Sequence, residues 1–134
     1  MTDDFKLEQG PIMKKYGYSL RVDRRKVVMR FMFNRAKATA KFRRLPWDLT
    51  IDEFDSLSRM NCYYCDAAPS CVARRKGYPG EVIYNGLDRI DSSGGYVIGN
   101  VFPACKWCNQ MKMDMPLSNF ISQCKRIASH CATK

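Results

Sequence analysis

Four of the cysteines form two C-x-x-C pairs, Cys62/Cys65 and Cys105/Cys108. A C-x-x-C turn can aim two thiolates at one ion, and two such turns complete the tetrahedral sulfur set that zinc prefers. Four thiolates leave no open coordination position, so the expected role of the zinc is structural. A thioredoxin-like redox pair or buried free thiols are the alternatives. A redox role needs only one pair in a βαβ setting, which the sequence lacks.

The chain has 134 residues and seven cysteines, and its first residues show no secretory signal. We therefore expect a reducing compartment, the cytoplasm of a bacterial or phage-infected cell, which favours metal ligation over disulfides. Cys124 and Cys131 are predicted to be small core residues of a last helix, and Cys71 an incidental surface cysteine. No apolar run approaches the ~18–20 residues of a membrane span, so no membrane partner is expected.

The net charge of +10 is concentrated near the start of the chain. Residues 14–44 hold twelve basic side chains and one acid, Asp23, whereas residues from 47 onward are nearly neutral. A field this uneven favours a polyanionic partner, which we take to be DNA, with RNA not excluded. A solvated basic face that only keeps the protein soluble is the alternative.

Helical composition without Gly or Pro predicts a helix from Arg24 to about Phe42, which Leu45-Pro46 ends. Basic residues at helical spacing line one face of it and are the predicted phosphate contacts, with Lys112 added near the site of chemistry: Lys26, Arg30, Lys37, Lys41, Arg44 and Lys112. Thr50 and Glu53 form a predicted capping box at the start of a short amphipathic helix over 51–60.

The second half predicts a loop over 66–81, a strand over 82–91, a turn at 92–95 and a short strand at 100–103. A helix from Cys105 to about Lys112 follows, and Ser118 is a predicted cap for a last helix. One apolar face of that helix is expected to be buried: Leu117, Phe120, Ile121, Cys124, Ile127 and Cys131. We expect one compact unit, with a basic arm and helix at 1–46 and a zinc-stabilised domain at 47–134.

Residues 85–112 resemble the HNH (ββα-metal) endonucleases, especially phage-type members with two C-x-x-C knuckles, and are similar to the recombination endonuclease VII family. The resemblance is carried by Asp88 on the first strand, by Asn100, and by Asn109 directly after the last knuckle cysteine. It implies an α+β fold, a small zinc-stapled ββα-metal domain with an N-terminal basic helix and a C-terminal helix. It also implies hydrolysis of phosphodiester bonds in double-stranded or branched DNA.

The resemblance also implies roles for single residues. Asp88 and Asn109 look like the two protein ligands of a catalytic Mg²⁺ or Mn²⁺ ion. Such a site leaves coordination positions for a phosphate oxygen and the leaving oxygen. Asn100 looks like the middle Asn of the HNH signature, which holds the hairpin loop.

One position departs from the family pattern, because Arg89 stands where a histidine normally activates the attacking water. Arginine stays protonated and cannot accept that proton. Asp91, on the same side of the strand, could be the base, and Asp88-Arg89-Ile90-Asp91 can be read in the register of an Asp-Arg-Gly-His motif. Alternatively the proton passes to solvent or phosphate while Arg89 clamps the phosphate, or catalysis is lost. The one histidine, His130, is expected at an exposed helix end.

The leading prediction is therefore an HNH-type, metal-dependent DNA endonuclease that nicks or cuts double-stranded or branched DNA. A zinc-containing nucleic-acid-binding protein that has lost catalysis is the second reading, and the missing histidine supports it. A homodimer is possible.

Overall fold

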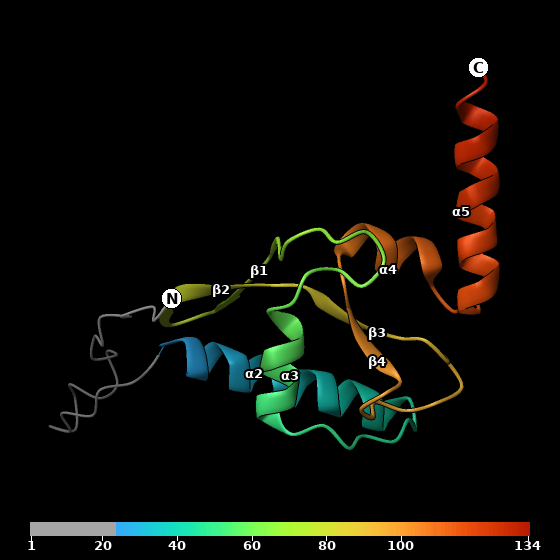
Figure 1. The fold of residues 1–134 in the computed structure, drawn as a ribbon. Helices are drawn as coiled ribbons and strands as arrows, with labels where there is room; N and C mark the ends of the chain where they lie inside the picture. Colours follow the sequence, from blue (N-terminus) through green and yellow to red (C-terminus); the bar gives the residue numbers. More distant parts are fainter. Residues whose placement is uncertain (1–23) are drawn as a thin grey trace, which may run out of the picture.

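The computed structural model describes residues 24–134, so the predicted arm over residues 1–20 lies outside the described part of the chain (Figure 1). Helices and strands alternate in two groups along this part. The elements are α2 (Arg24–Phe42), α3 (Ile51–Ser58), β1 (Cys71–Arg75), β2 (Tyr78–Tyr84), β3 (Gly86–Arg89), β4 (Val101–Ala104), α4 (Lys106–Lys112) and α5 (Leu117–Cys131). None of these helices is long and apolar enough to cross a membrane.

Helix α2 has the bounds predicted from the sequence and ends in a Schellman motif. The N–H of Leu45 donates to the carbonyl of Ala40, and the N–H of Arg44 donates to the carbonyl of Lys41. Arg44 occupies the left-handed position of this motif, with φ of 58°, where glycine is usual. The backbone reversal at Arg44 ends the helix before Pro46.

Strands β1 and β2 form an antiparallel hairpin where the sequence predicted a loop. The single strand predicted over 82–91 is also wrong, because the chain divides it at Asn85 into β2 and β3. Val82 is buried against α2, while its neighbour Ile83 pairs with Val72 on the exposed face. The alternation was hidden by the basic residues of β1, which point to solvent.

The larger core joins α2, α3 and the first hairpin. Its buried members are Val28, Met29, Phe54 and Val82. The rings of Phe33, Trp47 and Phe54 pack against one another beside it, with centroids 5.5 to 6.1 Å apart. The capping box predicted at the start of α3 is confirmed. The Thr50 hydroxyl accepts from the N–H of Glu53, whose carboxylate accepts from the N–H of Thr50.

Strands β3 and β4 form a second antiparallel hairpin, and α4 follows directly to complete a ββα unit. The loop between these strands docks on the segment after α2. Tyr96 exchanges backbone hydrogen bonds with Pro46 and Asp48. A Cβ at Gly95 would lie 2.5 Å from the Pro46 carbonyl oxygen, so this close approach requires glycine. The docking brings the C-terminal end of α2 to the ββα unit.

Helix α5 differs most from its prediction. It projects away from the other elements (Figure 1), and Phe120 is its one buried residue. Cys131 is exposed and Cys124 half-buried, so the prediction that both are core residues is wrong. The predicted cap is also wrong, because Pro116 occupies the N-cap position without a side-chain hydrogen bond. His130 is exposed, as expected.

Candidate metal centre and nucleic-acid interface

The two C-x-x-C pairs come together as one cluster. The sulfurs of Cys62, Cys65, Cys105 and Cys108 all lie within 4.8 Å of one another, and Cys65 Sγ is 3.7 Å from Cys105 Sγ. Zn–S bonds of about 2.3 Å in a tetrahedron require sulfur separations of roughly 3.8 Å. The donor set and its spacing therefore fit a structural zinc ion.

The surroundings of the cluster favour thiolates. Burial alone would raise the pKa of Cys62, but backbone N–H groups of Cys105, Cys65 and Tyr64 donate to its sulfur and lower the pKa to about 7. The sulfur of Cys105 likewise accepts from the N–H of Cys108. Metal binding needs deprotonated sulfur, and N–H donors stabilise that form before an ion arrives.

Asp88 and Asn109 line one pocket of about 280 Å³ beside this cluster. Asp88 comes from β3 and Asn109 from the second turn of α4. A Cβ on Gly86 would stand 3.5 Å from Asn109 Nδ2, so the bare glycine lets the amide lie close against β3. The other lining residues are Arg43, Leu87, Arg89, Ser92, Tyr96, Met113 and Asp114.

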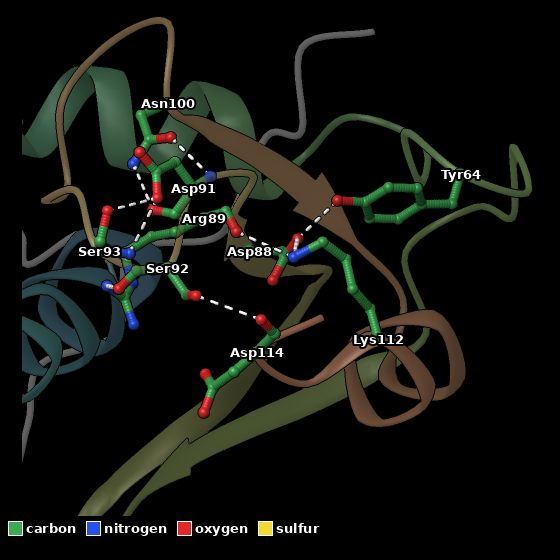
Figure 2. Close-up of polar contacts among 9 residues, drawn as sticks. All are labelled: Tyr64, Asp88, Arg89, Asp91, Ser92, Ser93, Asn100, Lys112 and Asp114. Atoms are coloured by element: carbon green, nitrogen blue, oxygen red, sulfur yellow. Dashed lines mark hydrogen bonds and ion pairs between the residues drawn. The ribbon is translucent and has the colours of Figure 1, made fainter. Parts of the chain in front are cut away.

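Asp88 is buried and held through one oxygen (Figure 2). Tyr64 Oη donates to Asp88 Oδ2 at 2.5 Å, and Lys112 Nζ lies 3.2 Å from the same oxygen. Lys112 also donates to the backbone carbonyl of Arg89 at 3.0 Å. Burial, together with the hydrogen bond and charge of Asp88, raises the pKa of Tyr64 far above its usual value. Tyr64 is therefore a protonated donor over the whole physiological pH range.

Lys112 is completely buried, at 0% exposure. This burial is at odds with the predicted phosphate contact, because the ammonium group faces Asp88 and a carbonyl instead of solvent. An ammonium group so far from water is tolerable only with such partners.

Arg89 is also buried, with 7% exposure. Its Nη1 donates to the carbonyls of Ser92 and Gly94, and its guanidinium lies 5.4 Å from the centroid of the Tyr96 ring. These contacts make Arg89 a brace of the β3–β4 loop. They are at odds with the predicted role of a free clamp on phosphate.

Asn100 and Asp91 organise the same loop (Figure 2). Asn100 accepts from the N–H of Asp91 and donates to the carbonyls of Asp91 and Gly95, the contacts expected of a residue that holds the hairpin loop. The Asp91 carboxylate accepts from the hydroxyl and N–H of Ser93, and these bonds lower its pKa. Asp91 is not among the pocket residues, and a lowered pKa makes it a weaker base.

The basic face of α2 leads toward the pocket. Lys37, Lys41 and Arg44 line a shallow groove of about 370 Å³ with Leu45, Pro46 and Trp47. The remaining predicted contacts, Lys26 and Arg30, are exposed further toward the start of α2. Arg43 follows the helix and borders the Asp88 pocket, so the cations continue from the groove to the site.

Three residues of the site were not predicted from the sequence: Arg43, Tyr64 and Asp114. Arg43 was one of twelve basic residues, and nothing in its spacing separated it from the others. Tyr64 lies between two knuckle cysteines, where an aromatic side chain usually indicates packing. Asp114 borders the pocket because α4 ends at Met113, where a φ of 49° reverses the chain.

The solved structure of the rare-cutting HNH restriction endonuclease PacI resembles this chain with a TM-score of 0.54 and 18% sequence identity. The alignment covers 92% of this chain and 89% of that one. The likeness confirms the predicted fold class, an HNH-like α+β fold with N- and C-terminal helices and small hairpins around the four-cysteine cluster.

An uncharacterized protein of Acanthamoeba polyphaga mimivirus is 36% identical over 98 residues. The match covers 73% of this chain, which spans only 16% of the length of that protein. No protein-family model matches the chain.

Proposed function

We propose that the chain is an HNH-type, metal-dependent DNA endonuclease that nicks or cuts double-stranded or branched DNA. One observation carries the proposal. Asp88 and Asn109, brought together by the ββα unit, line one pocket at the end of a basic groove. The HNH-like fold supports a nuclease assignment, and the geometry of this pocket supplies residues for its chemistry.

The donor set suits a hard divalent ion. One carboxylate oxygen from Asp88 and one amide oxygen from Asn109 are ligands that Mg²⁺ or Mn²⁺ accepts, with water completing the shell. When bound, such an ion polarises the scissile phosphate and stabilises charge on the leaving oxygen. Zinc held by the four cysteines has a separate, structural role in this proposal.

The chain's own cations hold the DNA. Lys37, Lys41 and Arg44 bind successive backbone phosphates along the groove, and exposed Arg43 binds the phosphate nearest the pocket. Phosphate contacts of this kind give affinity and register without sequence preference. Lys26 and Arg30 extend the same basic face.

The group that activates water is the open point of the mechanism. Asp91 is engaged by Ser93 outside the pocket, whereas Asp114 is exposed and borders the pocket together with Asp88. We assign Asp114 as the acceptor of the water's proton, because it is the second carboxylate of the pocket.

A second candidate is a zinc-containing nucleic-acid-binding protein without catalysis. The observation that favours it is the absence of histidine from the described pocket residues, since the single histidine of the chain lies on α5. Binding to DNA or RNA would then persist without metal-dependent cleavage.

The test is incubation of the zinc-loaded chain with supercoiled plasmid and Mg²⁺ or Mn²⁺. Asp88→Asn should reduce nicking by about 1,000-fold, which corresponds to several kcal/mol of metal-dependent stabilisation. Asp48→Asn removes an exposed carboxylate outside the pocket and serves as the matched control. Retarded migration of DNA without nicking by the wild-type chain would select the non-catalytic candidate.

The proton acceptor is tested in the same assay. Asp114→Asn should lower nicking by about 100-fold or more, and Asp91→Asn should have a small effect. The reverse order would return the role to Asp91.

A further inference from the structure

The two groups that hold Asp88 belong to the two cysteine knuckles. Tyr64 stands between Cys62 and Cys65, and its hydroxyl reaches Asp88 across 24 positions of sequence. Lys112 ends α4, one turn after Cys108 and two turns after Cys105, which is the N-cap of that helix. Each knuckle thus contributes one of the side chains that fix the same carboxylate oxygen.

The contacts around Asp88 are asymmetric. Tyr64 and Lys112 both bind Oδ2, and no described residue donates a hydrogen bond to Oδ1. Anchoring one oxygen fixes the rotation of the carboxylate. The remaining oxygen is then available to a ligand in the pocket that Asp88 and Asn109 line.

The position of Tyr64 is itself strongly constrained. Its ring packs edge-on against Tyr63 at 5.3 Å and against Phe120 at 5.5 Å. The N–H of Tyr63 donates to the Pro103 carbonyl of β4 at 2.8 Å, which ties the first knuckle to the hairpin that carries Asp88. A hydroxyl held by packing on both sides loses little entropy when it makes its hydrogen bond.

We infer that Tyr64 is a positioning residue, which transmits the order of the four-cysteine cluster to Asp88 and presents Oδ1 to a divalent cation. Lys112 fixes the same oxygen from the second knuckle. The cluster therefore supports the cation site as well as the fold. This inference rests on the proposed function, because it assigns a supporting residue to the cation site proposed there.

The test measures Mn²⁺ binding rather than cleavage. Zinc-loaded wild type, Tyr64→Phe, Tyr63→Phe and Asp88→Asn are titrated with Mn²⁺, and free Mn²⁺ is read by electron paramagnetic resonance. Tyr63 is the matched control, because it is the adjacent knuckle tyrosine and is half-exposed. Loss of a hydrogen bond that orients a ligand lowers metal affinity by about 10-fold or more. We expect this loss in Tyr64→Phe and wild-type affinity in Tyr63→Phe.

Zinc content and circular dichroism show that each variant is folded, so a purely structural loss is recognised. Mn²⁺ affinity of Tyr64→Phe equal to that of Tyr63→Phe, with Asp88-dependent binding in the wild type, overturns the inference and leaves the proposed function standing. No Mn²⁺ binding by the wild type, or binding that survives Asp88→Asn, overturns both.

Discussion

The basic helix α2 and the ββα unit of β3, β4 and α4 hold their charges in opposite surroundings. The cations of the α2 face, such as Lys37 and Lys41, are exposed and line an open groove. In the ββα unit Asp88, Arg89 and Lys112 are buried, and each has specific partners at hydrogen-bond distance. Both regions are rich in the same residue types.

The difference teaches that charge serves two purposes in this chain. Exposed cations act on a partner through a field that is additive and screened by salt. Buried charges act on one another over a few ångströms, and loss of one leaves the other without compensation. The first region is expected to tolerate single substitutions, and the second is not.

The largest effect is expected from the cysteine cluster that supports the ββα unit. Cys105→Ser should lose zinc and more than about 4 kcal/mol of unfolding free energy, because a ligand and an N-cap disappear together. Urea unfolding and metal analysis measure both losses. Cys124→Ser on the projecting α5 is the control, and equal losses in the two variants would mean that the cluster has no special role.

The next effect compares two lysines directly. Lys112→Met should destabilise the chain by about 3–5 kcal/mol, because it leaves Asp88 buried without its ammonium partner. Lys41→Met, on the exposed face of α2, should change stability by no more than about 0.5 kcal/mol. Urea unfolding at pH 7 gives both values.

A double variant checks that the cost of Lys112→Met comes from the ion pair. Asp88→Asn combined with Lys112→Met should cost at least about 1 kcal/mol less than the sum of the single changes. Strict additivity would show that the two groups are uncoupled and would weaken the contrast between the regions.

The exposed region should respond in DNA binding and not in stability. Lys37→Gln with Lys41→Gln should reduce the slope of log affinity against log salt by about 2, since each lost phosphate contact removes about 0.9. Fluorescence anisotropy of a labelled duplex over a salt series measures the slope. Lys125→Gln with Arg126→Gln, which removes two exposed cations of α5, should leave it unchanged.

The smallest effect concerns Asp55, which links α3 to α2. Burial of this carboxyl raises its pKa, but hydrogen bonds and charges from Arg59 and Arg25 outweigh burial and hold the pKa below its model value of 3.8. A lowered folded-state pKa means stability that is present above pH 3.8 and is lost as pH falls through the folded-state value. Asp55→Asn should cost about 1 kcal/mol at neutral pH.

Thermal unfolding from pH 7 down to pH 2 follows this difference between wild type and Asp55→Asn. The two curves should converge at the acid end, where Asp55 is protonated in both folded and unfolded states. A constant gap would assign the cost to packing and not to charge.

Patterns of short range predicted much of the fold. The capping box at Thr50 and the bounds of α2 depend on residues a few positions apart, and both are found as predicted. The spacing of each cysteine pair predicted a knuckle, and the cluster joins the two pairs. The β1–β2 hairpin was missed because Arg74 and Arg75 hide a strand whose alternate side chains pack on α2.

The sequence by itself determined the position of the excess charge, the two knuckles and the residue types of the candidate site. It could not determine which charges are buried, because Lys112 lies 24 positions from Asp88 and 23 from Arg89, to which it also binds. Burial and pairing depend on how β3 and α4 pack, with the knuckles joining at one cluster. The tertiary structure alone therefore made Lys112 a buried partner of Asp88 and left the lysines of α2 in solvent, because only packing decides which ammonium groups lose contact with water.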